Sequence, residues 1–321
     1  MTAKFRIHDL ELPMNAAGER FDAALATALP QYSRASLQRW ITAGAVLLDG
    51  RVVRPRERLA GGERVHVEAE FKPDLNVAPE AMALRIVYQD AAFLVVDKPA
   101  GLVVHPGAGN RAHTLQNALL AHDAALALVP RAGLIHRLDK DTSGLLVVAR
   151  TPETHHALVT MLQKRAIARG YLALCCGQPT AGGTIDEPIG RHRSQRTRMA
   201  VRSDGREAVT HYRIEERYRG HTLLRVQLET GRTHQIRVHL AHIGLPIVGD
   251  PVYGGRRRQV AGAGLALQAA LPLFRRQALH AQRLALDHPL TGRHHTFEAP
   301  LPTDFQALLT VLRGDAEQAR S

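Results

Sequence analysis

The alternation of apolar and polar positions predicts a chain of short strands and short helices. Within residues 18–68 the pattern predicts one helix that begins at Arg20 and ends near Pro30, because proline cannot continue a helix. A second helix is expected to follow, capped by Ser33 and closed by Gly44. This part of the chain is therefore predicted to form a small compact unit.

A β-hairpin is predicted after the second helix. Two apolar runs, 46–48 and 52–53, flank Asp49 and Gly50, the dipeptide that suits a type I′ turn. A further strand is expected over residues 64–67. The unit thus combines helices with strands in an α/β arrangement.

Residues 71–75 are interpreted as a linker, so we expect two domains, 1–74 and 75–321. Beyond the linker the pattern predicts strands at 85–88, 93–96, 145–149, 171–174, 211–216 and 223–229. It predicts helices at 114–122, from Thr151 past Leu162, from Thr233 to Gly244 and at 305–312. Residues 256–270 are expected to form a surface loop, 277–286 a strand or a helix, and 314–321 a frayed tail.

A polar segment, 136–144, leads directly into the apolar run 145–149, which has the length of a buried strand. Two carboxylates, Asp139 and Asp141, lie in this segment close to several cations. A loop that enters a core strand holds its side chains rigidly while still meeting solvent. An ionised carboxylate placed there can act as a nucleophile or a base. The alternative is that both residues only shape a turn.

The net charge of +12, from 42 basic and 30 acidic residues, indicates a polyanionic partner such as nucleic acid. Aromatic residues make up only 4% of the chain, so contacts from arginine to phosphate are expected to dominate over base stacking. Ten basic and nine acidic residues precede Phe71, so most of the excess charge lies in the larger domain. An exposed loop at 191–198 is predicted to contact phosphates through Arg193, Arg196 and Arg198.

Several other classes of protein are disfavoured. No run of eighteen apolar residues is present, and the first fifteen residues lack the apolar segment of a secretory signal. The adjacent Cys175 and Cys176 are interpreted as reduced core thiols, which favours a reducing, cytoplasmic location. The three histidines His234, His239 and His242 lack the spacing of a metal-binding helix, so no metal is expected.

Three segments carry a resemblance to a known family: HRLDKDTSGLL at 136–146, KPAGLVVHPGAGN at 98–110 and GRTHQIRVH at 231–239. They resemble the motifs of the RluA-type pseudouridine synthases, specifically the branch that acts on large-subunit ribosomal RNA. Residues 18–68 resemble an S4 RNA-binding domain. The resemblance implies an α+β protein, in which a mixed, mainly antiparallel sheet with flanking helices follows a small α/β S4 domain.

The resemblance also implies an activity, the isomerisation of specific uridines in large-subunit (23S) ribosomal RNA to pseudouridine. It assigns the catalytic role to Asp139, places Tyr171 on the target base and pairs Arg237 with the aspartate. Arg137 would occupy the position that the flipped base leaves. Arg232 would order its loop or contact RNA. No cofactor is implied.

For the S4-like unit, the resemblance implies that Arg34 and Arg39 on the second helix grip structured RNA. The expected partner is ribosomal RNA of the large subunit, either free or within pre-50S particles. The protein is expected to be a monomer that does not associate with membranes.

Alternative functions remain open at this point. The charge and the S4-like unit fit an RNA-binding ribosome-assembly factor equally well, and a synthase of the same family could act on another ribosomal site or on transfer RNA. A hydrolase that uses Ser143 and His136 is less favoured, because no nucleophile-elbow pattern surrounds Ser143. The residues also do not decide whether Asp139 attacks C1′, adds to the base or abstracts a ribose proton.

Overall fold

The computed structural model describes residues 5–30, 32, 34–70, 77–107, 109–195, 197–255 and 260–319. Five features predicted from the sequence lie outside or partly outside these ranges: the cap Ser33, the linker 71–75, the loop residue Arg196, the loop arginines 256–258 and the end of the tail at 320–321. The described residues form two large buried cores, one within residues 12–69 and the other within residues 92–312.

The N-terminal core lies between two helices and a four-stranded antiparallel sheet with strand order β1-β4-β2-β3. The elements are β1 Phe5–Glu11, η1 Met14–Ala16, α1 Phe21–Ala28, α2 Arg34–Thr42, β2 Val46–Leu48, β3 Arg51–Val52 and β4 Arg64–Glu70. Phe21, Leu25, Leu37 and Ile41 are fully buried, as the helical spacing predicts. Both helices and the hairpin of the sequence analysis are confirmed, whereas β1 was not predicted.

The turn between β2 and β3 is the type I′ turn that the sequence predicts. Asp49 and Gly50 have φ values of 48° and 75°, and a type I′ turn requires positive φ at both central positions. The Asp49 carboxylate also accepts a hydrogen bond from the backbone N–H of Arg64 at 2.9 Å, which ties the turn to β4.

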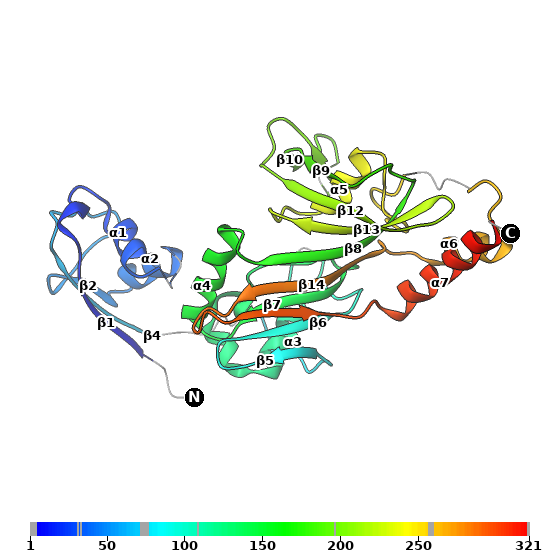
Figure 1. Ribbon diagram of the computed structural model, residues 1–321. Coiled ribbons are helices and arrows are strands. Elements are labelled where there is room, and N and C mark those ends of the chain that lie inside the picture. Colours follow the sequence, from blue (N-terminus) through cyan, green and yellow to red (C-terminus); the bar gives the residue numbers. More distant parts are fainter. Residues whose placement is uncertain are drawn as a thin grey trace.

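The second core is organised by a nine-stranded sheet (Figure 1) with strand order β5-β6-β7-β14-β8-β13-β12-β9 and with β15 paired to β14. Its strands are β5 Arg85–Gln89, β6 Phe93–Lys98, β7 Ser143–Ala149, β8 Ala168–Cys176, β9 Gly183–Asp186, β12 Val209–Arg217, β13 His221–Leu228, β14 Leu279–Asp287 and β15 His294–Glu298. Among the described residues every pairing in this sheet is antiparallel except that of β7 with β14. The expected mixed, mainly antiparallel sheet is thereby confirmed.

Helices flank the sheet, and a separate two-stranded hairpin, β10 Ile189–Arg191 and β11 Met199–Val201, lies beside it. The helices are α3 Leu115–His122, η2 Ala124–Leu128, η3 Pro130–Gly133, α4 Pro152–Gln163, α5 Gln235–His242, α6 Leu265–Leu273 and α7 Thr303–Gln318. Thr114 and Thr151 cap α3 and α4 through their side chains. All residues of β6 and β7 are buried, so these two strands are packed on both faces.

Three predicted elements differ from the structure. The helix expected from Thr233 to Gly244 begins only at Gln235, because the backbone of His234 is left-handed, and it ends at His242. The expected loop up to residue 270 contains α6. The expected frayed tail continues α7 to Gln318, because Asp315 is buried and accepts a hydrogen bond from the backbone N–H of Gly264 at 2.6 Å.

Both cysteines are free thiols at the end of β8, with Cys175 buried and Cys176 half-buried. Within the described ranges, no helix combines the length and the apolar character that a membrane crossing requires.

Candidate active site

A cleft of about 670 Å³ lies where four segments of the larger domain meet. The four segments are the polar loop before β7, the end of α4, strand β8, and the chain from the end of β13 into α5. Asp139, Tyr171 and Arg237 all line this cleft, although they are far apart in the sequence. The structure therefore brings together the three residues that the sequence analysis singles out as catalytic.

Lys98, the last residue of β6, anchors the loop that carries Asp139. The Lys98 ammonium is fully buried and donates hydrogen bonds to the carbonyl oxygens of Pro99, Leu102 and Lys140 at 2.8, 2.9 and 2.9 Å. Burial lowers the pKa of Lys98 to about 7, against the opposing effect of nearby carboxylates. This contact fixes the backbone next to Asp139.

The same loop is held from the side of β14. Gln277 donates a hydrogen bond to the Thr142 hydroxyl at 3.1 Å, and the Ser143 hydroxyl lies 2.9 Å from Nδ1 of His280. His280 is also the register partner of Ser143 in the parallel pairing of β7 with β14. The position of Asp139 thus depends on two strands that flank β7.

Arg237, on α5, connects two carboxylates. Its Nη1 donates to Oδ2 of Asp139 at 2.9 Å, while Nε and Nη2 donate to the two oxygens of Asp250 at 2.7 and 2.9 Å. Arg237 and Asp250 are buried, and Asp139 is partly exposed to the cleft. Because Asp250 fixes the plane of the guanidinium, Nη1 is directed at Asp139 in a defined geometry.

Asp250 is a site residue that the sequence analysis missed. Burial alone would raise the pKa of Asp250, but the hydrogen bonds and charge of Arg237 outweigh it and hold this pKa below its usual value. The backbone N–H groups of Val252 and Tyr253 also donate to its Oδ1, at 2.8 and 3.0 Å. The segment GDPVYG at 249–254 was the available signal, since its aspartate follows the GRTHQIRVH segment closely.

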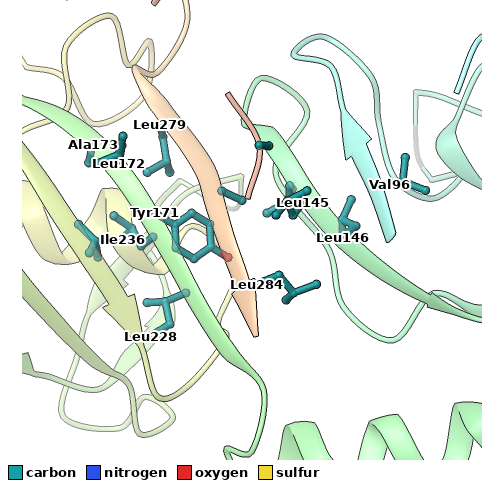
Figure 2. Close-up of a cluster of buried hydrophobic side chains, with 14 of the residues drawn as sticks. Val96, Leu145, Leu146, Tyr171, Leu172, Ala173, Leu228, Ile236, Leu279 and Leu284 are labelled. Atoms are coloured by element: carbon teal, nitrogen blue, oxygen red, sulfur yellow. The ribbon is translucent and has the colours of Figure 1, made fainter. Parts of the chain in front are cut away.

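Tyr171, on β8, forms an apolar wall of the cleft. Figure 2 shows its ring among Leu228, Ile236 and Leu279, which also line the cleft. Burial raises the pKa of the Tyr171 hydroxyl, with a smaller contribution from the Asp139 charge, so the phenol is protonated at neutral pH. A flat, partly apolar surface beside a carboxylate is suited to packing against a planar base.

Asp139 and Asp141 differ in their surroundings. Asp139 lines the cleft and binds Arg237, whereas Asp141 is not among the described residues that line it. The sequence motif places both carboxylates in one polar segment, but the turn around Thr142, whose N–H donates to the Asp139 carbonyl at 3.1 Å, separates them.

The predicted RNA-contacting arginines of the larger domain lie in two regions. Arg137 is exposed and lines the cleft. Arg232 also lines it, but its Nε donates to the Glu207 carbonyl at 2.8 Å, which orders the loop. Arg193 and Arg198 lie between β10 and β11, Arg193 exposed and Arg198 half-buried.

The two predicted arginines of the N-terminal unit differ from each other. Arg34 binds the fully buried Asp22 through two nitrogens at 3.1 and 2.9 Å, and about half of its side chain is exposed. Its guanidinium thus has a structural partner that the sequence analysis did not foresee. Arg39 is exposed, and its Nη2 lies 3.2 Å from the Ser36 hydroxyl.

His234 and Tyr253 complete the site, and the sequence analysis assigned neither a role there. Nε2 of His234 lies 3.9 Å from Oδ1 of Asp139, and its Nδ1 lies 2.8 Å from the Tyr253 hydroxyl. The Arg237 guanidinium lies over the Tyr253 ring at 5.0 Å from its centre.

The residues considered for a hydrolase or a metal site make other contacts. Ser143 is buried against His280, and Nε2 of His136 accepts a hydrogen bond from the Val147 N–H at 3.3 Å, so these two residues do not form a nucleophile and base pair. His239 contacts Thr210 and the Glu187 carbonyl. Within the part of the chain that the structure describes, no three His, Cys, Asp or Glu residues are grouped as a metal site would require.

Comparison with known proteins identifies two families of domain in the chain. Residues 92–242 match the model of the RNA pseudouridylate synthase family, and residues 19–65 match that of the S4 domain. Two human proteins of known structure are similar to the larger part of the chain. RNA pseudouridylate synthase domain containing 4 has a TM-score of 0.56 at 27% identity and covers 71% of this chain and 93% of its own. RNA pseudouridylate synthase domain containing 1 has a TM-score of 0.54 at 27% identity, with 71% and 87% covered.

Full-length relatives are much more similar in sequence. The chain is 54% identical over 308 residues to ribosomal large subunit pseudouridine synthase D of Xanthomonas campestris pv. campestris, which covers 96% of this chain and 93% of the relative. It is 53% identical to the protein of that name from Pseudomonas aeruginosa, with 96% of both chains covered, and 52% identical to that from Escherichia coli K12, with 95% and 94% covered. With this identity over nearly its whole length, the chain belongs to the RNA pseudouridylate synthase family.

Proposed function

We propose that the protein converts specific uridines of large-subunit ribosomal RNA into pseudouridine, with Asp139 as the catalytic residue. The observation that carries the proposal is the cleft that Asp139 and Tyr171 both line, with the Asp139 carboxylate bound by Arg237. The relatives named ribosomal large subunit pseudouridine synthase D support the substrate class. The charge of +12 supports a polyanionic substrate.

The reaction breaks the N1–C1′ bond, turns the uracil and joins C5 to C1′, while C5 loses its proton and N1 gains one. A uridine within folded RNA must leave its stack to enter the cleft, and Arg137 at the cleft is placed to fill the vacated position. Tyr171 packs against the uracil, while Asp139 acts as nucleophile or base. Arg237 orients the Asp139 carboxylate and offsets its negative charge in a site that the RNA closes from water.

The protein also binds RNA outside the cleft, through its N-terminal domain and the segment between β10 and β11. We propose an S4 RNA-binding domain with its linker at 1–74 and a catalytic domain at 75–321, in agreement with the two buried cores. Arg39 on α2 and the arginines between β10 and β11 are the proposed phosphate contacts. The protein acts as a monomer in the cytoplasm, on free ribosomal RNA or on pre-50S particles.

The decisive experiment incubates the purified protein with large-subunit ribosomal RNA that lacks pseudouridine, both protein-free and in precursor particles. Modified positions are mapped by carbodiimide treatment and reverse-transcription stops. We expect new stops with the wild type and with the control Asp141→Asn, and none with Asp139→Asn, whose RNA affinity stays within a few fold. Turnover by Asp139→Asn would remove the catalytic assignment. No stops on either substrate, together with tight binding, would favour an RNA-binding assembly factor.

A further inference from the structure

His234 has a backbone conformation that residues other than glycine seldom adopt. Its φ of 57° and ψ of 20° are left-handed, and it directly precedes α5. Such a conformation costs free energy and persists where surrounding contacts compensate for it. The side chain of His234 makes these contacts within the cleft, next to Asp139.

The two ring nitrogens of His234 have different partners. Nε2 faces Oδ1 of Asp139 at 3.9 Å, while Oδ2 of the same carboxylate is occupied by Arg237. This distance exceeds that of a hydrogen bond, but such contacts in free enzymes commonly shorten when the substrate binds. His234 is thus the second polar side chain directed at the Asp139 carboxylate.

The Tyr253 hydroxyl determines which ring nitrogen carries the proton. Its oxygen accepts a hydrogen bond from the Met199 N–H at 2.8 Å, and it lies 2.8 Å from Nδ1 of His234. The hydroxyl uses its own proton when it donates a hydrogen bond to Nδ1 of His234. Nδ1 accepts this hydrogen bond and therefore carries no proton. Burial lowers the pKa of His234, so the ring is neutral at pH 7 and its single N–H lies on Nε2, towards Asp139.

Tyr253 is itself held by the basic hairpin, residues 189–201 with the strands β10 and β11. The Arg198 guanidinium lies over its ring at 5.3 Å from the centre, and Met199, the backbone donor to its hydroxyl, begins β11. The ring also packs in an apolar cluster with Ile189 of the same hairpin and Val238 of α5. A displacement of the hairpin would therefore move the Tyr253 hydroxyl and, through it, His234.

We propose that His234 is a positioning residue for Asp139, which donates its Nε2–H to Oδ1 when RNA fills the cleft, and that Tyr253 sets this tautomer and couples it to the basic hairpin. The inference rests on the proposed catalytic role of Asp139. The proposal adds that RNA bound to the basic hairpin helps to orient the Asp139 carboxylate, besides increasing the affinity for RNA.

Three variants and one control test the proposal with an RNA transcript as substrate. His234→Ala removes the donor, whereas His234→Gln places an amide N–H near the position of Nε2. Tyr253→Phe keeps the ring and removes the hydroxyl. His242→Gln, at an exposed histidine of the same helix, is the control. We expect His234→Ala to lower kcat about ten- to hundred-fold with little change in KM, and His234→Gln to restore a large part of it. The control should match the wild type.

The tautomer provides a readout that a merely structural role would not change. In the wild type, ¹⁵N spectra of labelled imidazoles, assigned by the signal lost in His234→Gln, should show His234 protonated at Nε2. Tyr253→Phe should shift this signal towards the Nδ1–H form and lower kcat. An Nδ1–H tautomer in the wild type would overturn the proposal. So would a wild-type kcat in His234→Ala when Asp139→Asn is inactive. An active Asp139→Asn would instead overturn the proposed function. The ¹⁵N result is independent of activity, so the two failures can be distinguished.

Discussion

Arg237 and Asp250 form a buried ion pair with two parallel hydrogen bonds, Nε to Oδ2 at 2.7 Å and Nη2 to Oδ1 at 2.9 Å. The Asp250 side chain has no exposed surface, and that of Arg237 is 5% exposed. The pair leaves only Nη1 of Arg237 for the cleft, where it meets Asp139. Asp250, which is not among the described residues that line the cleft, thus determines how Asp139, the proposed catalytic residue, is held.

Asp250→Asn should weaken both folding and catalysis. It removes a buried charge and leaves the Arg237 guanidinium partly uncompensated, for which we expect a loss of about 3 kcal/mol in the free energy of unfolding. Urea unfolding measures this loss, and kcat should fall because Nη1 is no longer fixed. Asp304→Asn is the control, because Asp304 forms a similar pair with Arg276 but is half exposed, and a loss below about 1 kcal/mol is expected there.

The pH dependence of this difference has a defined sign. Because the pKa of Asp250 is lowered in the folded state, its contribution to stability is fully present above the unfolded carboxyl pKa of about 3.9 and is lost as the pH falls through the folded value. The stability advantage of the wild type over Asp250→Asn should be constant between about pH 5 and 7, because Asp250 is ionised in both the folded and the unfolded state there. It should shrink below about pH 4. A constant advantage at all pH values would contradict the assignment.

Lys98 should make stability increase with pH. Its pKa is about 7 in the folded protein, and a lysine in the unfolded chain has a pKa of about 10.4. Between these values the unfolded state binds more protons, so the free energy of unfolding rises with pH. Unfolding of the wild type relative to Lys98→Met, measured from pH 6 to 10, should show a gain of about 3 to 5 kcal/mol. A flat difference would mean that the carbonyl contacts keep the ammonium protonated throughout.

Tyr171→Phe tests whether the hydroxyl or only the ring is used. The ring would still pack in the cleft, so RNA affinity should be preserved. If the hydroxyl takes part in proton transfer at C5, kcat should fall about 10²-fold or more. Single-turnover rates at saturating RNA measure this step, and an unchanged rate would restrict Tyr171 to packing.

Gly144→Ala should be strongly destabilising. Gly144 has a φ of 113°, and a Cβ there would lie 2.2 Å from the Ala281 carbonyl oxygen in β14. Backbone strain and the clash together should cost about 3 kcal/mol or more. Gly107→Ala is a suitable control, since a Cβ built there meets no heavy atom within 4 Å among the described residues other than its chain neighbours. Thermal unfolding of both variants decides the comparison.

Arg193→Gln should weaken RNA binding in a salt-dependent way. Loss of one phosphate contact reduces the slope of log K against log salt by about 1 and leaves sequence preference unchanged. Arg313→Gln removes an arginine of α7 that pairs with Glu216 of β12; it provides a matched loss of charge and should leave the slope unchanged.

Signals that are local in the sequence predicted their elements correctly. The Asp49-Gly50 turn and the helix starts at Thr114 and Thr151 each depend on contacts within a few residues, so the local sequence determines them. The polar segment before β7 likewise identified Asp139 and Asp141 as candidates, and the resemblance to the family motif selected Asp139. Position in the fold was not needed for these predictions.

Features that depend on contacts between distant segments were missed. Gly314 suggested the end of a helix, but the buried Leu308, Leu312 and Asp315 continue α7 along α6. The pairing of Asp250 with Arg237, and the approach of His234 to Asp139, arise only when α5 packs beside the loop before β7. No periodicity in the sequence encodes these distances.

The pairing of β7 with β14 has a consequence for the synthesis of the protein. Ser143 and Gly144 pair with His280 and Ala281, so the support for the Asp139 loop comes from residues translated about 140 positions later. A nascent chain that ends before β14 lacks Gln277 and His280, the partners of Thr142 and Ser143. Such a chain can present its S4 domain while the Asp139 loop, already held by Lys98 of β6, still lacks its contacts from the side of β14. The enzyme therefore becomes competent late in its own translation, after the strand that completes the centre of its sheet has emerged.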